Sequence, residues 1–215
     1  MPTHTLNLQM ATELILSRPL SKPDFSSIAD LSMYAKIDIE AIRYLSEYRY
    51  DFIILAITSL DLELAECLGG WHGSPDLIFE DLIQLEADCA KALCKGECGL
   101  GFKKLEYLST ETAIELAKSN ENLDLHIPFL SVDIASILAQ HKSYISMQLA
   151  NEPTYEVAAE IAQHRGYGIF FYHLQKHPSK TLILGLSQNK DKWLSIKKHP
   201  YPGDFYYMEL MTKDL

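Results

Sequence analysis

The sequence predicts an α/β fold of stacked repeats, with a parallel sheet on one face and short helices on the other. Three observations carry this prediction. The tripeptide AQH occurs twice, at 139–141 and 162–164. Apolar residues recur in columns at steps of 21 to 25 residues. Pairs with strand-like alternation precede stretches with helical spacing. A repeat of about 23 residues cannot bury its own apolar face, so such repeats must stack.

Each repeat is expected to contain one short helix. Its marker is the large apolar residue that precedes the alanine of AQH and its equivalents. A small residue follows each marker, and a residue three positions earlier is usually alanine, which favours a helix packed closely on its neighbours. The markers are Leu45, Leu68, Leu93, Leu116, Leu138, Ile161 and Leu186.

A short strand is expected before each helix, because two apolar residues there are separated by a single position. Side chains alternate between the faces of a strand, so both members of a pair should point into the core. The residues between and after them should point outward. The pairs are Leu6/Leu8, Leu31/Met33, Phe52/Ile54, Leu77/Phe79, Leu100/Phe102, Leu123/Leu125, Ile145/Met147, Ile169/Phe171 and Leu194/Ile196.

The periodicity divides the chain into three parts. Residues 1–29 are expected to form an N-terminal cap with the first strand, with Ser21–Asp24 resembling a helix cap. Residues 30–191 form the repeat region. Residues 192–215 form a C-terminal strand and cap, in which the PGD turn at 202–204 separates two possible strands.

Three stretches resemble bacterial leucine-rich-repeat proteins: YLSTETAIELAKSNENLDL (107–125), FLSVDIASILAQHKSYISM (129–147) and PTYEVAAEIAQHRGYGIFF (153–171). The resemblance implies a right-handed solenoid and a tendency to bind proteins, and it implies no catalytic residues. The chain departs from the common pattern where the family usually has asparagine or cysteine. That position holds Ile57, Leu82, Leu105, Pro128, Ala150 and Leu174.

Composition excludes several functions. The net charge of −10 and the pI of about 5.2 argue against nucleic acid or an anionic membrane as the main partner. No stretch approaches the roughly 20 apolar residues of a membrane span, so a cytoplasmic location is the expectation. The phosphate-binding and nucleophile motifs GxxxxGK[ST], GxGxxG and GxSxG are absent. We therefore expect a protein with neither catalytic residues nor a cofactor.

An acidic residue recurs five positions before each of the first six helix markers, and stacked carboxylates could bind a cation. A role in stabilising helix N-termini explains more of this pattern than a cation site does. A cap residue stands two positions before each acid, and an acid in the first turn complements the helix dipole. The acids are Glu40, Glu63, Asp88, Glu111, Asp133 and Glu156, after the cap residues Asp38, Asp61, Glu86, Ser109, Ser131 and Thr154.

The cysteines and one histidine pair are the remaining candidates for chemistry. Cys67, Cys89, Cys94 and Cys98 are expected to be reduced thiols in apolar positions. A metal site among them, or a reactive thiol at Cys98, is the alternative. His173 and His177 have a spacing that could bind a metal on a helix, but the periodicity places them in a turn. We therefore predict no metal.

The outward strand residues form the candidate binding surface. They mix polar and aromatic groups, as binding surfaces do, and exposed apolar residues usually mark a contact. The predicted partner-binding residues are Ile53, Leu55, Ile78, Asp124, His126, Gln148, Phe170 and Tyr172.

These observations favour a non-catalytic scaffold that binds a protein partner through its sheet face. Two alternatives stay open: an acidic inhibitor or immunity-type protein for a basic partner, and a metal- or thiol-dependent enzyme. The caps, or a second copy of the chain in a homodimer, could also cover the apolar strand residues.

His141 and His164 are expected to stack one strand spacing apart near helix C-termini, where a cation or donor suits the carbonyl groups.

Overall fold

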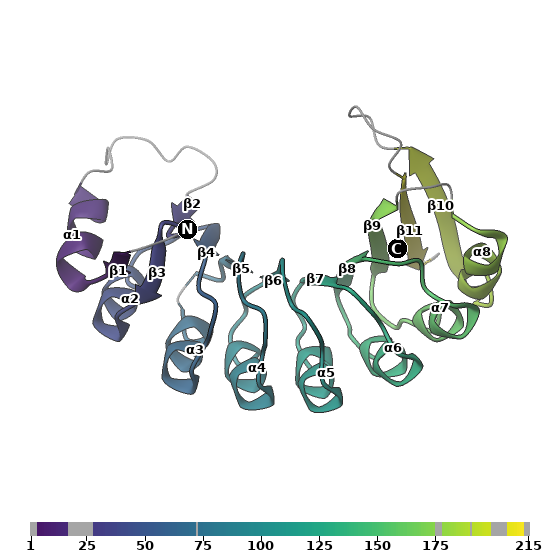
Figure 1. Cartoon of the computed structure of the whole chain (residues 1–215), viewed down its shortest axis with the longest axis horizontal. Helices are drawn as coiled ribbons and strands as arrows, with labels where there is room; N and C mark the ends of the chain where they lie inside the picture. The colour runs from purple at the N-terminus through teal and green to yellow at the C-terminus, as the bar shows by residue number, and fades with distance from the viewer. Residues whose placement is uncertain are drawn as a thin grey trace. The chain divides into compact units, whose positions relative to one another are not determined.

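The computed structural model describes residues 4–16, 28–71, 73–174, 178–189, 191–198 and 206–212. The chain divides into two compact units, Met1–Lys104 (unit 1) and Leu105–Leu215 (unit 2). Within the described ranges eight helices alternate with strands, and most of the strand pairs are parallel (Figure 1). The predicted α/β class is therefore confirmed. The expected cap at 21–24 and the turn at 202–204 lie outside the described ranges.

Unit 1 contains two parallel sheets. Strands β1 (His4–Leu6) and β3 (Tyr34–Ile37) form the smaller one. The larger one has the order β2-β4-β5-β6, from β2 (Ile28–Asp30), β4 (Phe52–Leu55), β5 (Asp76–Phe79) and β6 (Leu100–Phe102). Neighbouring helices pack against each other on one side of the strands: α1 (Leu8–Leu16), α2 (Ile39–Leu45), α3 (Leu62–Gly69) and α4 (Ala87–Leu93).

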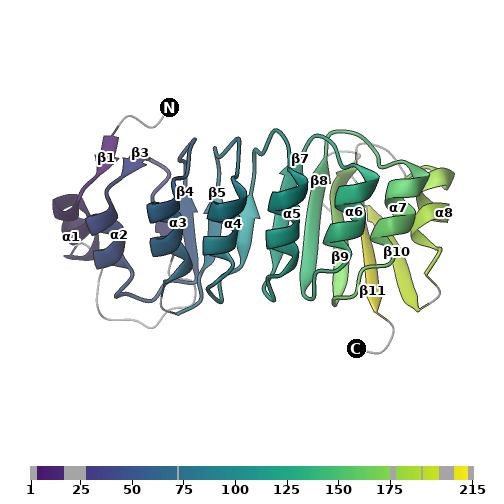
Figure 2. The same cartoon turned by 90° about the horizontal axis from the view of Figure 1, so that it is seen from below.

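Unit 2 combines a parallel sheet with a C-terminal hairpin. The parallel strands are β7 (Leu123–Ile127), β8 (Tyr144–Leu149) and β9 (Gly168–Leu174). Strands β10 (Lys192–Lys198) and β11 (Tyr206–Thr212) pair antiparallel, and β11 also pairs antiparallel with β9. Figure 2 looks onto the helices of the unit, with the strands behind them: α5 (Thr110–Ala117), α6 (Val132–Leu138), α7 (Tyr155–Ile161) and α8 (Lys180–Leu186).

The strand at 192–198 exists, but its expected place as the next parallel strand is wrong. The chain turns back after β10, and β11 takes the position beside β9. Met208 and Leu210 of β11 are buried there, opposite Phe171 and Ile169 of β9. The hairpin thus ends the parallel pairing and extends the core of unit 2.

The helix markers are confirmed as core residues, since every one of them is fully buried. The strand prediction is wrong in β4, where Ile53 and Leu55 are fully buried and Phe52 and Ile54 are half-buried on the other face. Parallel pairing aligns Ile53 with Leu77 and Leu55 with the buried Phe79. The segment FIIL is apolar at all four positions, so its own alternation cannot choose a face.

Two other predicted pairs of inward-facing strand residues, both near the N-terminus, also need correction. Met33 lies in an exposed turn, whereas Tyr34, which was expected to face outward, is buried. Leu8 belongs to α1 and is exposed. With β4 corrected, the buried strand residues at equivalent positions of the repeats form a more regular series, which we call the core column, with steps of 22 to 24 residues. Its members are Leu31, Leu55, Phe79, Phe102, Leu125, Met147 and Phe171.

The helix starts follow the predicted cap chemistry. The side chains of Asp61, Ser109, Ser131, Thr154 and Ser179 each accept a hydrogen bond from the backbone N–H three residues later. Asp38 and Glu86 precede their helices without such a bond. Each predicted acid lies in a first helical turn. The backbone N–H of Glu156, with help from Thr154, lowers the pKa of the Glu156 carboxyl, so the carboxylate suits this position.

A column of side-chain donors links neighbouring repeats within each unit. Each donor lies three residues after a helix marker and reaches a backbone carbonyl of the preceding repeat. These bonds satisfy carbonyl groups of the turns. The bonds are Trp71 Nε1 to Tyr48 O (3.3 Å), His141 Nε2 to Glu121 O (2.9 Å), His164 Nε2 to Ser143 O (3.0 Å) and Asn189 Nδ2 to Ala162 O (3.0 Å).

A candidate protein-binding face

The candidate site is the outer face of unit 2, which we define as the side of strands β7, β8, β9 and β11 opposite the helices (Figure 1). Along β7 and β8, buried residues alternate with half-buried ones. The buried residues face the helices, so the half-buried ones lie on the outer face. In β11 the half-buried Glu209 lies between the buried Met208 and Leu210 and therefore shares this face.

Four aromatic residues form a continuous cluster on this face. The ring of Tyr144 lies 5.4 Å from that of Tyr167 and 5.7 Å from that of Phe170, centre to centre. Phe170 and Tyr172 are stacked at 6.2 Å. Tyr167 and Tyr172 are exposed, and the other two rings are half-buried. We call Tyr144, Tyr167, Phe170 and Tyr172 the aromatic cluster.

Gly168 allows a second apolar group to approach the cluster. In the sheet, Gly168 lies between Tyr144 of β8 and Met211 of β11. A Cβ atom on Gly168 would lie 2.4 Å from the Met211 sulfur, so any other residue would displace that side chain. The thioether is soft and packs readily beside aromatic rings. The absence of a side chain at Gly168 therefore brings Met211 to the border of the cluster.

Polar residues border the cluster on both sides. One row across the sheet reads Asp124, Ser146, Phe170 and Glu209 on adjacent strands. His126 and Gln148 pair in a second row. The Nε2 atom of His126 lies 3.4 Å from a carboxylate oxygen of Asp124. An apolar centre with a polar rim is the usual anatomy of a protein interface.

The structure brings five of the eight predicted binding residues together: Asp124, His126, Gln148, Phe170 and Tyr172. Ile78 belongs to unit 1, where it is half-buried on the outer face of β5. Ile53 and Leu55 are core residues of unit 1 and cannot contact a partner, which corrects their predicted role.

Sequence reasoning missed Tyr144 and Tyr167. Tyr144 precedes the first member of the pair Ile145/Met147, so extending the alternation backwards by one residue would have placed it outward. Tyr167 lies in the turn before β9, where strand alternation does not apply. Only its ring contact with Tyr144 identifies it as part of the cluster.

Unit 1 has a smaller outer face of similar character. Ile54 and Ile78 pair across β4 and β5, and Phe52 pairs with Asp76. Burial raises the pKa of the Asp76 carboxyl. Glu80 follows on the same face and is exposed. This face is apolar with an acidic border. Within the described ranges, its side chains make no ring–ring contacts of the kind found in the aromatic cluster.

In the described part of the chain, groups of three or more His, Cys, Asp or Glu side chains that could hold a metal ion do not occur. The four cysteines are free thiols, and Cys89 and Cys98 are buried. Burial first, and then the carboxylates around it, raises the pKa of the Cys89 thiol, which disfavours the reactive thiolate. The His173 side chain and His177 lie outside the described residues.

Within the described ranges, none of the helices is both long and apolar enough to cross a membrane. A scan against protein-family models found no match, and searches of curated proteins and of solved structures found none either.

Proposed function

We propose that this chain is a non-catalytic scaffold that binds a protein partner through the outer face of unit 2. The observation that carries the proposal is the aromatic cluster, whose half-exposed rings contact one another on a sheet face that none of the described helices covers. Tyrosine and phenylalanine are enriched at the centres of protein interfaces, where they bury large areas at low entropic cost. The polar rim of Asp124, His126 and Gln148 would give such an interface its specificity.

We further propose that each unit is a stretch of right-handed, leucine-rich-repeat-like solenoid. Three features support this finer description: the core column with steps of 22 to 24 residues, the helix caps at equivalent positions, and the donor column. In this proposal Trp71, His141, His164 and Asn189 replace the asparagines of the family's common pattern.

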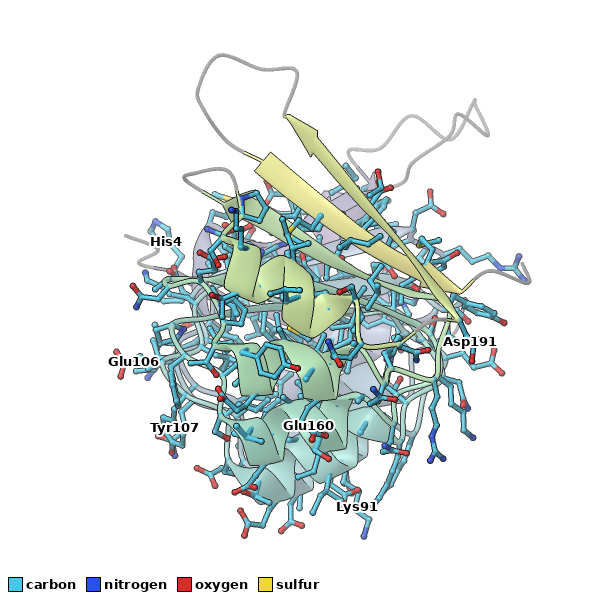
Figure 3. The ribbon with its side chains drawn as sticks, turned by 90° about the vertical axis from the view of Figure 1, so that its right-hand side faces the viewer. His4, Lys91, Glu106, Tyr107, Glu160 and Asp191 are labelled. Atoms are coloured by element: carbon cyan, nitrogen blue, oxygen red, sulfur yellow. The ribbon has the colours of Figure 1, made fainter. Side chains whose placement is uncertain are left out.

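Site-specific photo-crosslinking tests the proposed function. The crosslinking amino acid p-benzoylphenylalanine replaces Gln148 on the outer face or, as the control, Glu160 on helix α7 (Figure 3). We expect irradiation in the cells that produce the protein to give a discrete crosslinked protein from position 148 only. Sequencing of the crosslinked peptide identifies the partner.

Variants of the cluster then test the same face with purified partner. Replacing both Phe170 and Tyr172 with alanine should weaken binding at least 100-fold, because interface aromatics carry much of the binding energy. The melting temperature should change little, since both side chains lie outside the core. Equal crosslinking from positions 148 and 160, or unchanged affinity of the double variant, would contradict the proposed face.

A further inference from the structure

Exposed apolar side chains follow one edge of unit 2, where the chain enters its helices. Tyr107 and Phe129 lie in the loops before α5 and α6, each nine residues before a helix marker, and they are 53% and 70% exposed. Val132 and Tyr155, the first residues of α6 and α7, are exposed too. Because α5 packs on α6 and α6 on α7, these residues lie in adjacent repeats. We call Tyr107, Phe129, Val132 and Tyr155 the loop edge.

The two loops hold their exposed side chains away from the core. In each loop two consecutive exposed residues, at 106–107 and at 128–129, lie between two buried ones. Figure 3 shows Glu106 and Tyr107 of the first loop pointing away from the ribbon. The buried anchors are Leu105, Leu108, Ile127 and Leu130. A side chain presented by an anchored backbone loses little conformational entropy when a partner covers it, which favours a contact surface.

The loop edge carries negative charge. Segments 105–117, 127–138 and 149–161 contain its loops and its three helices, and none of them contains lysine, arginine or histidine. Within the described ranges, the four acids beside its apolar residues make no ion pairs. A helix N-terminus carries only about half an elementary charge, so the three helix ends do not cancel four carboxylates. The acids are Glu106, Glu111, Asp133 and Glu156, all of them exposed.

The basic residues of these repeats lie elsewhere. Lys104, the residue before unit 2, is paired with Asp81 at 2.8 Å. The loop edge ends at Tyr155, one repeat before Lys180 at the start of α8. The others follow the helices, at the opposite edge of the unit: Lys118, Lys142 and Arg165. A ligand whose charge complements the loop edge is therefore basic.

The apolar side chains narrow the choice of ligand further. Tyr107 and Phe129 expose large rings beside charged groups, and an apolar patch with a polar rim usually marks a contact with another protein. A purely basic ligand would leave these rings in water. A second copy of this chain fits poorly, because in a two-fold dimer the acids of the edge would approach those of the other copy. Nucleic acid and anionic membranes meet the same objection.

We propose that the loop edge of unit 2 binds a basic amphipathic segment of a protein partner. Large apolar side chains of the segment cover the rings of Tyr107 and Phe129, and its lysine or arginine residues approach the carboxylates of Glu106, Glu111 and Asp133. The loop edge lies where the chain enters the helices and not on the outer face. This second surface therefore goes beyond the proposed function and does not depend on it.

The test uses the full-length protein and the peptide acetyl-Lys-Leu-Leu-Lys-Lys-Leu-amide as the probe. One control peptide has glutamate in place of every lysine, and the other has serine in place of every leucine. Assigned ¹H–¹⁵N NMR spectra follow the backbone during titration. We expect the probe to shift the signals of residues 105–111 and 127–133 and to bind at least fivefold more tightly than either control, because the edge offers both apolar and charged contacts.

Matched variants locate the binding. Phe129→Ala should weaken binding of the probe at least threefold, and Glu106→Gln at least twofold. The control for the first is Leu184→Ala, which removes an exposed apolar side chain from α8. The control for the second is Asp191→Asn, because Asp191 is exposed on the opposite side of the unit from Glu106 (Figure 3). Unchanged spectra elsewhere in each variant show that it is folded.

The inference is overturned if either control peptide binds as tightly as the probe, if the shifts lie outside the loop edge, or if the control variants weaken binding as much as Phe129→Ala and Glu106→Gln. Self-association of the protein through Phe129 would also overturn it. The proposed function fails separately, because the loss of crosslinking from position 148 concerns the outer face and leaves the loop edge unaffected.

Discussion

The imidazole rings of His141 and His164 are stacked in the interior of unit 2, with their centres 6.3 Å apart and their planes at 19°. Both side chains are buried, and each Nε2 donates to a carbonyl of the preceding repeat. The predicted stacking is confirmed, although the spacing exceeds one strand separation. The role as donor also agrees with the structure. A cationic role for His141 does not agree with the structure, because burial lowers the pKa of its imidazole.

Stability should therefore fall in mild acid. The folded-state pKa of His141 lies below the ordinary value of about 6.5, so the unfolded chain binds the proton more readily. The free energy of unfolding should decrease as the pH falls below about 6.5 and should keep decreasing until the folded protein is protonated too. Urea midpoints at pH 7.5 and pH 5 measure this loss.

The variant His141→Asn tests the assignment to this residue. Asparagine fills the equivalent position at Asn189 and donates the same kind of bond without titrating. The variant should lose less stability than the native protein between pH 7.5 and pH 5. Replacing the exposed His4 with asparagine serves as the control for the same substitution at the surface. An unchanged dependence in His141→Asn would exclude this histidine as the cause.

Removing the ring of His164 should be costly at any pH. His164→Ala leaves the carbonyl of Ser143 without this donor and opens a cavity beside His141, which together should cost about 2–3 kcal/mol of unfolding free energy. The neighbouring Gln163 is exposed, and Gln163→Ala should change stability by less than about 0.5 kcal/mol. Urea denaturation of both variants makes the comparison, and equal losses would argue against a structural role of the donor column.

The corrected orientation of β4 makes a direct prediction. Leu55 is fully buried, so Leu55→Ala should cost about 2–5 kcal/mol. Ile54 is half-buried on the outer face, and Ile54→Ala should cost about 1 kcal/mol. Thermal denaturation of the two variants distinguishes the orientations. A larger loss at Ile54 than at Leu55 would restore the orientation predicted from the sequence.

Close packing of α3 on α4 depends on Gly69. A Cβ atom there would lie 2.2 Å from the carbonyl oxygen of Ala92, so Gly69→Ala should force the helices apart and cost about 1–3 kcal/mol. Gly101 is the matched control, because the nearest atom to its Cβ position is 3.7 Å away and alanine fits. Differential scanning calorimetry should show a lower melting temperature for Gly69→Ala alone. Equal melting temperatures would mean that the helices adjust without cost.

Local chemistry in the sequence determined the helices, their caps and most of the core. A cap such as Ser131 and a marker such as Leu138 act within one helix, so their pattern is readable without knowing the neighbours. The same holds for strands such as β7, where the polar residues Asp124 and His126 alternate with apolar ones and define the two faces.

Only the tertiary structure decided the features that depend on pairing between distant segments. The face of Ile53 and Leu55 is set by alignment with β5, because their own segment is apolar throughout. The position of β11 beside β9 depends on where the chain turns back. Tyr144 and Tyr167 meet across 23 residues of sequence, so the cluster that makes the outer face of unit 2 a candidate site arises from long-range packing that alternation does not encode.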